Sequence, residues 1–282
     1  MRNSTPSLKK DMRLMPEYTI LLIWLIFSII TIGWIFLASF STTREIFTNN
    51  LLKSGIHFLN YWKALVTQNV ARYFLNSAIY TCTSSIGILL VSAPAAYILG
   101  RFEFKGRKMV INTFLVTMSI PTVMIIIPIF AVMTSLKLIG SMFTLIILYI
   151  VSNVPFTVYF LTSFFSTLPK ELEDAAAIDG CSPYKTFWSI ILPLAQNGII
   201  TVGIFNFMSV WNEYFMALIF ANKTELRPLG VGLQAIVQSM RSIGDYAGLF
   251  AAVVIVFLPT FILYLILSGR IISGITGGAV KG

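Results

Sequence analysis

The chain has 282 residues, of which 57% are hydrophobic and only 11% are charged, and its mean hydropathy is +0.84. Soluble domains carry about 25% charged residues, so this composition excludes an ordinary soluble protein and predicts a membrane protein. The formal net charge of +9 would suggest nucleic acid as a partner of a soluble protein. In a membrane protein it follows from the bias of lysine and arginine toward cytoplasmic loops, so we expect membrane lipid around the chain and no nucleic acid partner.

The first apolar run covers residues 20–40, and residues 1–19 before it contain four basic side chains. A signal peptide would have a shorter apolar core and a cleavage site of small residues. About 20 apolar residues are enough to cross a bilayer. We therefore expect an uncleaved first membrane span that is entered from a cytoplasmic N-terminal segment.

The next segment, residues 41–71, reads as a loop outside the membrane. Tyr61 and Trp62 indicate a short interfacial helix, because tyrosine and tryptophan favour the membrane–water boundary. A second span is expected over residues 73–99. It is followed by the densest basic cluster of the chain, residues 101–108, which places that end of the span in the cytoplasm.

Four further spans are expected over residues 109–133, 141–165, 198–220 and 247–267. The third contains Pro121 and Pro128, which are tolerated where neighbouring helices satisfy the freed carbonyls. Residues 222–246 are expected outside and residues 268–282 form a cytoplasmic tail. The sequence thus predicts an all-α fold, a polytopic bundle of six transmembrane helices (the transmembrane domain, residues 20–267) with both termini in the cytoplasm.

Residues 168–195, which we call the polar loop, form the most polar stretch between the spans. Pro169 can begin a helix, Gly180 can adopt the positive φ of a helix end, and Ser182-Pro183 can cap a second helix. This pattern predicts a helix, a sharp turn and another helix. Helical spacing predicts one shared side for each helix, formed by Leu172, Ala175, Ala176 and Asp179 in the first and by Tyr184, Phe187, Trp188 and Ile191 in the second.

Such a pair could fit the groove of another protein. The alternative is an amphipathic helix pair on the membrane surface.

The polar loop resembles the EAA loop of ABC-importer permeases. The resemblance rests on Asp174-Ala175-Ala176, Gly180, Ile190 and Leu192-Pro193 at the family spacing, with Asp174 in place of the usual Glu. It implies a type I importer permease fold in which the loop is cytoplasmic and docks on an ATP-hydrolysing subunit. The coupling residues that it implies are Glu173, Asp174, Ala175, Ala176, Asp179, Gly180, Leu192 and Pro193.

The tail, residues 274–282, resembles that of sugar-importer permeases similar to the smaller permease of the maltose system. Asn76-Ser77 and Trp211-Asn212-Glu213 extend the likeness through most of the chain. It implies that the tail contacts the ATPase through Gly278, Val280 and Lys281, whereas composition alone would predict a frayed end. It also implies a bacterial cell membrane, a second related permease subunit, two ATP-binding cassette subunits, an extracytoplasmic solute-binding protein and a sugar substrate.

The sequence contains no GxxxxGK[ST] motif, so we expect no ATPase activity, no enzymatic activity and no catalytic residue in this chain. No cofactor is expected here; ATP and Mg would be bound by the partner ATPase subunits. His57 is the single histidine and has no ligand companion at metal-binding spacing. Cys82 and Cys181 lie in segments that should not meet, which predicts free thiols.

Polar residues within the spans are candidates for a substrate pathway, because they are costly in a membrane. The candidates are Asn153, Asn206, Asn212 and Glu213. Asn206 and Glu213 are seven residues apart and are expected to share one face of the fifth span. Nearby aromatic rings would suit a sugar, which has apolar ring faces and many hydroxyls. The alternative role is hydrogen bonding between helices.

Together these observations predict the permease subunit of an ATP-driven, binding-protein-dependent importer of a sugar or oligosaccharide. The sugar class rests on the resemblance. An ion-coupled secondary transporter would need broken helices and an internal repeat. An ABC permease for a solute other than a sugar and a membrane scaffold without substrate also remain open.

Overall fold

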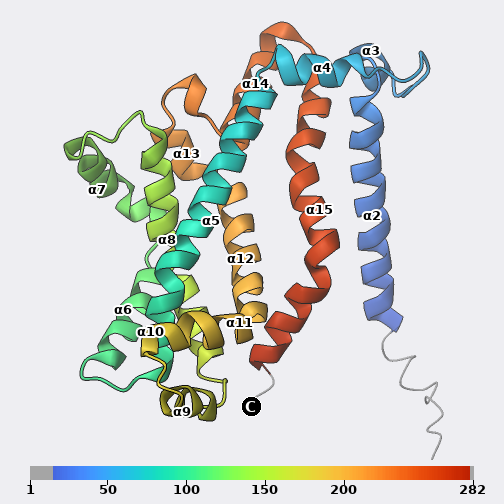
Figure 1. Ribbon diagram of the computed structural model, residues 1–282. Coiled ribbons are helices and arrows are strands. Elements are labelled where there is room, and N and C mark those ends of the chain that lie inside the picture. Colours follow the sequence, from blue (N-terminus) through green and yellow to red (C-terminus); the bar gives the residue numbers. More distant parts are fainter. Residues whose placement is uncertain (1–14, 280–282) are drawn as a thin grey trace, which may run out of the picture. The chain divides into compact units, whose positions relative to one another are not determined.

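The computed structural model describes residues 15–279, which contain helices and no β-strand (Figure 1). The predicted all-α class is confirmed. The chain divides into two compact units. The first runs to Gln68 and includes Ile236–Ile255, and the second comprises Asn69–Ala235 and the residues from Val256 on.

Four of the described helices are long and apolar enough to cross a membrane: α2 (Met15–Ser39), α5 (Val70–Arg101), α8 (Met142–Phe165) and the start of α15 (Tyr246–Ala279). The number rises to six if each of two sharply bent helix pairs counts as one span. Helices α2, α5 and α8 overlap the expected spans 20–40, 73–99 and 141–165.

The third expected span, 109–133, is not one helix. It consists of α6 (Arg107–Met118) and α7 (Thr122–Ser135), which meet at an angle of 102°. Pro121 lies at the break with extended backbone (φ −63°, ψ 129°). A proline has no N–H to continue the helix and disfavours helical backbone in the residue before it. Here the proline divides the helix.

The fifth expected span, 198–220, is also interrupted. Helix α12 (Gln196–Trp211) ends with Asn212 as its C-cap, and α13 (Phe215–Phe220) begins after a break. The Glu213 carboxylate accepts hydrogen bonds from the backbone N–H groups of Met216 at 2.7 Å and Ala217 at 3.1 Å. Glu213 therefore satisfies free donors at the start of α13, and the prediction that it shares a helix face with Asn206 is wrong.

Residues 222–246, expected as an outside loop, contain the 3₁₀ turn η2 (Thr224–Leu226) and the helix α14 (Leu229–Ile243). Helix α15 continues past 267, the expected end of the sixth span, to Ala279. Gly278 thus lies in a helix, whereas composition alone predicted a frayed end. Val280 and Lys281 lie outside the described residues.

In the first unit, two short helices follow α2: α3 (Thr43–Phe47) and α4 (Leu59–Val66). Helix α4 carries Tyr61 and Trp62, where a short helix was predicted. Asn60 fixes α4 to the end of α2 by donating to the carbonyls of Ser39 and Ser41, both at 2.9 Å.

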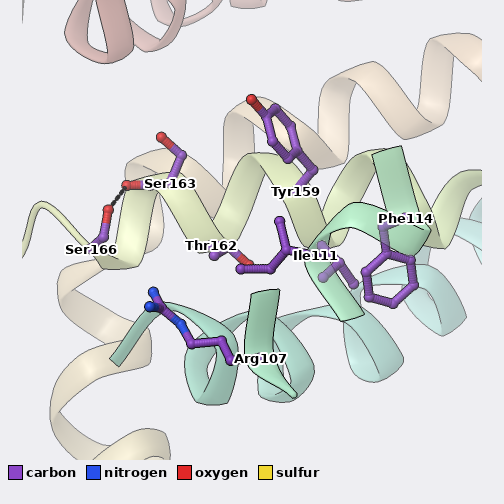
Figure 2. Close-up of a pocket in the computed structure, with 8 residues that line it drawn as sticks. Arg107, Ile111, Phe114, Tyr159, Thr162, Ser163 and Ser166 are labelled. Atoms are coloured by element: carbon purple, nitrogen blue, oxygen red, sulfur yellow. Dashed lines mark hydrogen bonds between the residues drawn. The ribbon is translucent and has the colours of Figure 1, made fainter. Parts of the chain in front are cut away.

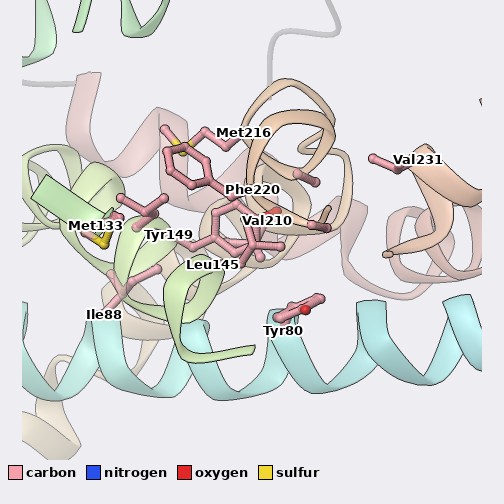
Figure 3. Close-up of a cluster of buried hydrophobic side chains, with 12 residues drawn as sticks. Tyr80, Ile88, Met133, Leu145, Tyr149, Val210, Met216, Phe220 and Val231 are labelled. Atoms are coloured by element: carbon pink, nitrogen blue, oxygen red, sulfur yellow. The ribbon is translucent and has the colours of Figure 1, made fainter. Parts of the chain in front are cut away.

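In the second unit, α5 packs along α8 (Figure 1). One end of this pair has a hydrophobic core that includes Tyr80, Leu145, Tyr149 and Phe220, each at most 2% exposed (Figure 3). Nearby, the Asn76 amide donates to the carbonyls of Glu225 and Arg227, which fastens the connection before α14 to α5.

The opposite end of the α5–α8 pair holds the polar loop. A second core there contains Tyr97, Leu161, Phe165, Phe187 and Ile191. The loop consists of α9 (Glu171–Ile178), α10 (Pro183–Thr186), the π-helical turn η1 (Phe187–Ile191) and α11 (Leu192–Leu194). The buried rings of this core help to fix the loop to the ends of α5 and α8.

Candidate functional site

The predicted turn of the polar loop is present at Gly180. Its φ is +73°, a conformation that favours glycine. The Gly180 N–H donates to the Ala177 carbonyl at 3.1 Å, and the Cys181 N–H donates to the Ala176 carbonyl at 2.9 Å. These two bonds form a Schellman motif, which closes the end of α9 in one defined geometry.

The second helix of the loop begins as predicted but continues differently. Ser182 is its N-cap and accepts a bond from the Lys185 N–H at 3.3 Å, with Pro183 in the first turn. The helix then widens into η1, where the Leu192 N–H donates to the Phe187 carbonyl five residues back. Pro193, without an N–H, cannot donate to the carbonyl four residues before it. Single π turns are rare and often occur at functional sites.

The expected smooth side of α9 is not a single surface. Ala176 is 2% exposed and Leu172 packs against the core beneath the loop, whereas Ala175 and Asp179 are exposed. In this two-turn helix the side chains that face the core, Leu172 and Ala176, are four residues apart. Ala175 and Asp179 therefore turn toward solvent.

The second expected side is also divided. Phe187 and Ile191 are buried, but Trp188 is 38% exposed and Tyr184 is 75% exposed. Ile178, which the sequence did not single out, is 87% exposed at the end of α9. We define the exposed face of the polar loop as Asp174, Ala175, Ile178, Asp179, Gly180 and Tyr184.

Glu173 does not belong to this exposed face. Its carboxylate accepts hydrogen bonds from Arg101, the last residue of α5, with a shortest distance of 2.6 Å to Arg101 Nη2. The side chains of Arg101 and Glu173 are only 2% and 20% exposed. Sequence reasoning counted Arg101 only as one of the basic residues after the second span.

The remaining implied coupling residues lie beside an apolar hollow of about 310 Å³ between α5 and the end of the loop. Leu192 is half-buried and Pro193 is exposed, and both line it together with Trp188. The lining is almost wholly apolar, so this hollow holds no group for acid–base or metal chemistry.

A second hollow, of about 200 Å³, lies between α6 and the last turns of α8 (Figure 2). The side chains of Arg107 and Ser166 in its lining bond within the chain. Arg107 donates to the Leu99 carbonyl and to Glu103, both at 2.7 Å, and the Ser166 hydroxyl donates to the Ser163 carbonyl at 2.7 Å. The positive charge of Arg107 is therefore already neutralised by Glu103.

Two of the four pathway candidates connect helices. The Asn206 side chain is buried and its Oδ1 accepts from the Thr157 hydroxyl at 3.0 Å, while Nδ2 has no hydrogen-bond partner within the described part of the chain. Asn153 Oδ1 accepts from the Ser209 hydroxyl at 2.9 Å. Both amides thus join α8 to α12, as the helix-packing alternative predicts.

The other two candidates lie in the break after α12. Asn212 is exposed and its amide donates to the Met208 carbonyl at 2.8 Å. Glu213, besides capping α13, accepts a bond from the Tyr149 hydroxyl at 2.9 Å. Asn212 is therefore the candidate whose side chain is most open to a solute.

With this geometry in place, comparison with known proteins identifies the family. Residues 92–276 match the family described as "Binding-protein-dependent transport system inner membrane component". This chain belongs to that family. The matched range includes the whole polar loop, and the family consists of membrane transport components rather than enzymes.

Several relatives resemble this family member over nearly their whole length. The diacetylchitobiose uptake system permease protein NgcG of Streptomyces coelicolor is 32% identical over 94% of this chain and 88% of its own. The sulfoquinovosyl glycerol transport system permease protein SmoH of Agrobacterium fabrum is 32% identical over 88% and 87%. The trehalose transport system permease protein SugB of Mycobacterium tuberculosis is 28% identical over 91% and 93%.

A solved structure shares the fold. It is that of a bacterial ABC transporter involved in the import of the acidic polysaccharide alginate. One of its chains superposes with a TM-score of 0.82 and 22% identity, covering 95% of this chain and 99% of that one. The predicted importer-permease fold is therefore confirmed.

Proposed function

We propose that this chain is the permease subunit of a bacterial ABC importer for a sugar or oligosaccharide. Family membership supplies the transport role, and the names of three relatives, for diacetylchitobiose, trehalose and sulfoquinovosyl glycerol, favour a sugar. The observation that carries the coupling role is the polar loop. It presents Ile178 and Tyr184 to solvent while its base is held in the core of the second unit.

The exposed face suits a protein groove better than the membrane surface. Two large apolar side chains, Ile178 and Tyr184, are exposed on this face together with Asp174 and Asp179. Burial of Ile178 and Tyr184 by a partner would be favourable, since a fully buried side chain of this size contributes about 1.5–3 kcal/mol. A helix lying on anionic lipid typically has lysine and arginine on its polar face, and carboxylates there oppose that placement.

In this mechanism two ATPase subunits bind ATP and Mg, close on one another, and move the polar loop as a rigid body. The second unit then shifts between states open to opposite sides of the membrane. A second related permease completes the path, and a solute-binding protein delivers the sugar to the extracytoplasmic loops. The polar loop and both termini lie in the cytoplasm, with Gly278, Val280 and Lys281 near the ATPase.

The solute path of this chain passes the break between α12 and α13, where Asn212 is exposed and aromatic rings lie nearby. The half-buried ring of Phe207 stacks on the ring of Trp211, which is only 7% exposed, with the ring centroids 5.7 Å apart. An aromatic face beside an amide suits the apolar face and the hydroxyls of a sugar ring. Asn153 and Asn206 contribute by holding α8 against α12.

The test is uptake into proteoliposomes that contain the complete complex, with radiolabelled diacetylchitobiose, trehalose and sulfoquinovosyl glycerol as probes. We expect uptake of at least one sugar that requires ATP, Mg and the binding protein, and co-purification of this chain with a nucleotide-binding subunit. Uptake driven by an ion gradient without ATP would instead establish a secondary transporter. ATP-driven uptake of another solute only would disprove the sugar class.

A further inference from the structure

Arg101 joins three segments at the end of the second unit where the polar loop begins. Its Nη1 donates to the carbonyls of Phe165 at 3.3 Å and Leu168 at 2.7 Å, and its Nη2 donates to the Pro169 carbonyl at 3.1 Å. Its Nε donates to both carboxylate oxygens of Glu173, at 3.0 and 2.9 Å. One guanidinium thus holds the end of α8, the connection to α9, and α9 itself to the last residue of α5.

We propose that Arg101 and Glu173 form a clasp that transmits movement of the polar loop to α5, and that Glu173 is a positioning residue rather than a contact with the ATPase. This inference rests on the proposed function of the loop and assigns a separate role to one of its acids. Asp174, the neighbouring acid, is exposed and free to face a partner.

The clasp requires arginine rather than a positive charge alone. One guanidinium donates at once to a carbonyl at the end of α8 (Phe165), to two carbonyls of the connection to α9 (Leu168 and Pro169) and to a carboxylate. Lysine offers three donors from one nitrogen and cannot reproduce this planar arrangement. The 2% exposure of the Arg101 side chain means that water cannot replace the lost bonds easily.

A second contact between α5 and the polar loop, which we call the aromatic joint, lies one helical turn before the clasp. The ring of Tyr97 is 5.1 Å from that of Phe187 in η1 and 6.0 Å from that of Phe165 in α8, measured between centroids. All three rings are buried. A single contact would let the loop pivot on α5, whereas the clasp and the aromatic joint together oppose rotation.

A buried ion pair is weak support for a stabilising role by itself, so the test must separate coupling from folding. We compare Arg101→Lys and Glu173→Gln with Arg107→Lys. Arg107 is a matched control because it belongs to the same basic segment and bonds to Leu99 and Glu103 without touching the loop. The complete complex is reconstituted, and the sugar is the member of the three-sugar panel that the wild-type complex imports.

We expect Arg101→Lys and Glu173→Gln to co-purify with the ATPase subunit at the wild-type level, because the exposed face is unchanged. We expect the number of ATP molecules hydrolysed per sugar imported to rise about tenfold. A factor of this size corresponds to a typical coupling free energy between two sites. The double variant should equal the single ones, since both remove the same link. Arg107→Lys should behave as the wild type.

A second measurement needs no transport. Hydrogen exchange of the α9 amides in the purified chain should accelerate in both clasp variants and not in Arg107→Lys. Unchanged exchange, or ATPase binding lost in Glu173→Gln but kept in Arg101→Lys, would overturn the clasp. A wild-type complex without ATP-driven uptake would overturn the proposed function, while the exchange result would still decide whether the clasp exists.

Discussion

At the scale of single residues, Gly232 is a position where α14 closely approaches Tyr73 of α5. An added Cβ there would lie 2.1 Å from Cδ2 of Tyr73, whose residue is only 5% exposed. We predict that Gly232→Ala lowers the unfolding temperature of the purified chain, because overpacking of a filled site costs about 1–3 kcal/mol.

The control for that variant is Gly230→Ala in the same helix. Its added Cβ would lie 3.6 Å from the nearest atom, in the Tyr214 ring, which is ordinary van der Waals contact. Alanine also favours a helix more than glycine does, so the unfolding temperature should stay equal or rise slightly. Equal losses in both variants would contradict the close approach of α14 to Tyr73.

The stability of the segment between α2 and α4 should depend on pH through Glu45. Its carboxylate accepts from the N–H groups of Thr42 at 2.8 Å and Ser54 at 2.5 Å. Hydrogen bonding, chiefly from the Thr42 backbone, lowers the pKa of Glu45 from 4.5 to about 2. A lowered pKa means that the stabilisation is present above pH 4.5 and is lost as the pH falls toward 2.

We therefore predict that protection of the Ser54 amide from hydrogen exchange is constant above pH 4.5 and decreases between pH 4.5 and 2. Glu45→Gln should show weak protection at every pH, because the carboxylate that holds the amide is absent. Strong protection of the Ser54 amide at every pH in the variant would contradict this role of Glu45. The spacing of Thr42 and Glu45 is that of a capping box, so this feature was recognisable in the sequence.

The two adjacent acids of α9 show what a sequence leaves undecided at this scale. Glu173 and Asp174 have the same charge and stand side by side, and the resemblance implied one role for both. Successive helix residues point in directions about 100° apart, so one meets Arg101 and the other meets solvent. The partner of Glu173 lies 72 positions away in the chain, and no local pattern indicates it.

At the scale of elements, hydropathy located most helices but not their breaks. An apolar run indicates a lipid environment, and it remains apolar whether the helix is straight or broken. Pro121 was expected to be tolerated within the third span, but the sequence does not say whether a proline kinks or divides a helix. The break before α13 is stabilised by Glu213 with Tyr149 from another helix, a contact that only the fold creates.

The turn of the polar loop was predictable because it depends on one residue. No neighbouring atom lies within 4 Å of a Cβ built on Gly180, so a substitution there acts through the backbone alone. We predict that co-purified ATPase decreases in the order wild type, Gly180→Asn, Gly180→Ala, Gly180→Pro. Alanine in this conformation costs about 1–2 kcal/mol, and asparagine tolerates it better.

Proline at position 180 cannot adopt the positive φ and removes the N–H that donates to Ala177. For each variant, the amount of co-purified ATPase is divided by the total amount of this chain recovered from the membrane. Loss of ATPase binding is thereby separated from loss of protein. Wild-type binding by Gly180→Pro would show that the turn is not needed for the docking of a partner.

At the scale of the whole molecule, composition and one spaced motif were enough for the fold class. A chain with 11% charged residues and several long apolar runs can satisfy its backbone in a membrane by forming helices. The motif of the polar loop added the family, and the relatives support the sugar class. Neither the composition nor the motif identifies a solute, because neither of them describes a solute-binding surface.

The central claim is that the polar loop faces the cytoplasm, where it can receive force from an ATPase. Cys181 follows Gly180 directly and is partly exposed, so it reports on the position of the turn. A Cys82→Ser background removes the other thiol of the chain. A membrane-impermeant maleimide should label Cys181 in inside-out vesicles and leave it unlabelled in right-side-out vesicles. Labelling in right-side-out vesicles alone would place the loop on the outer side and contradict the account.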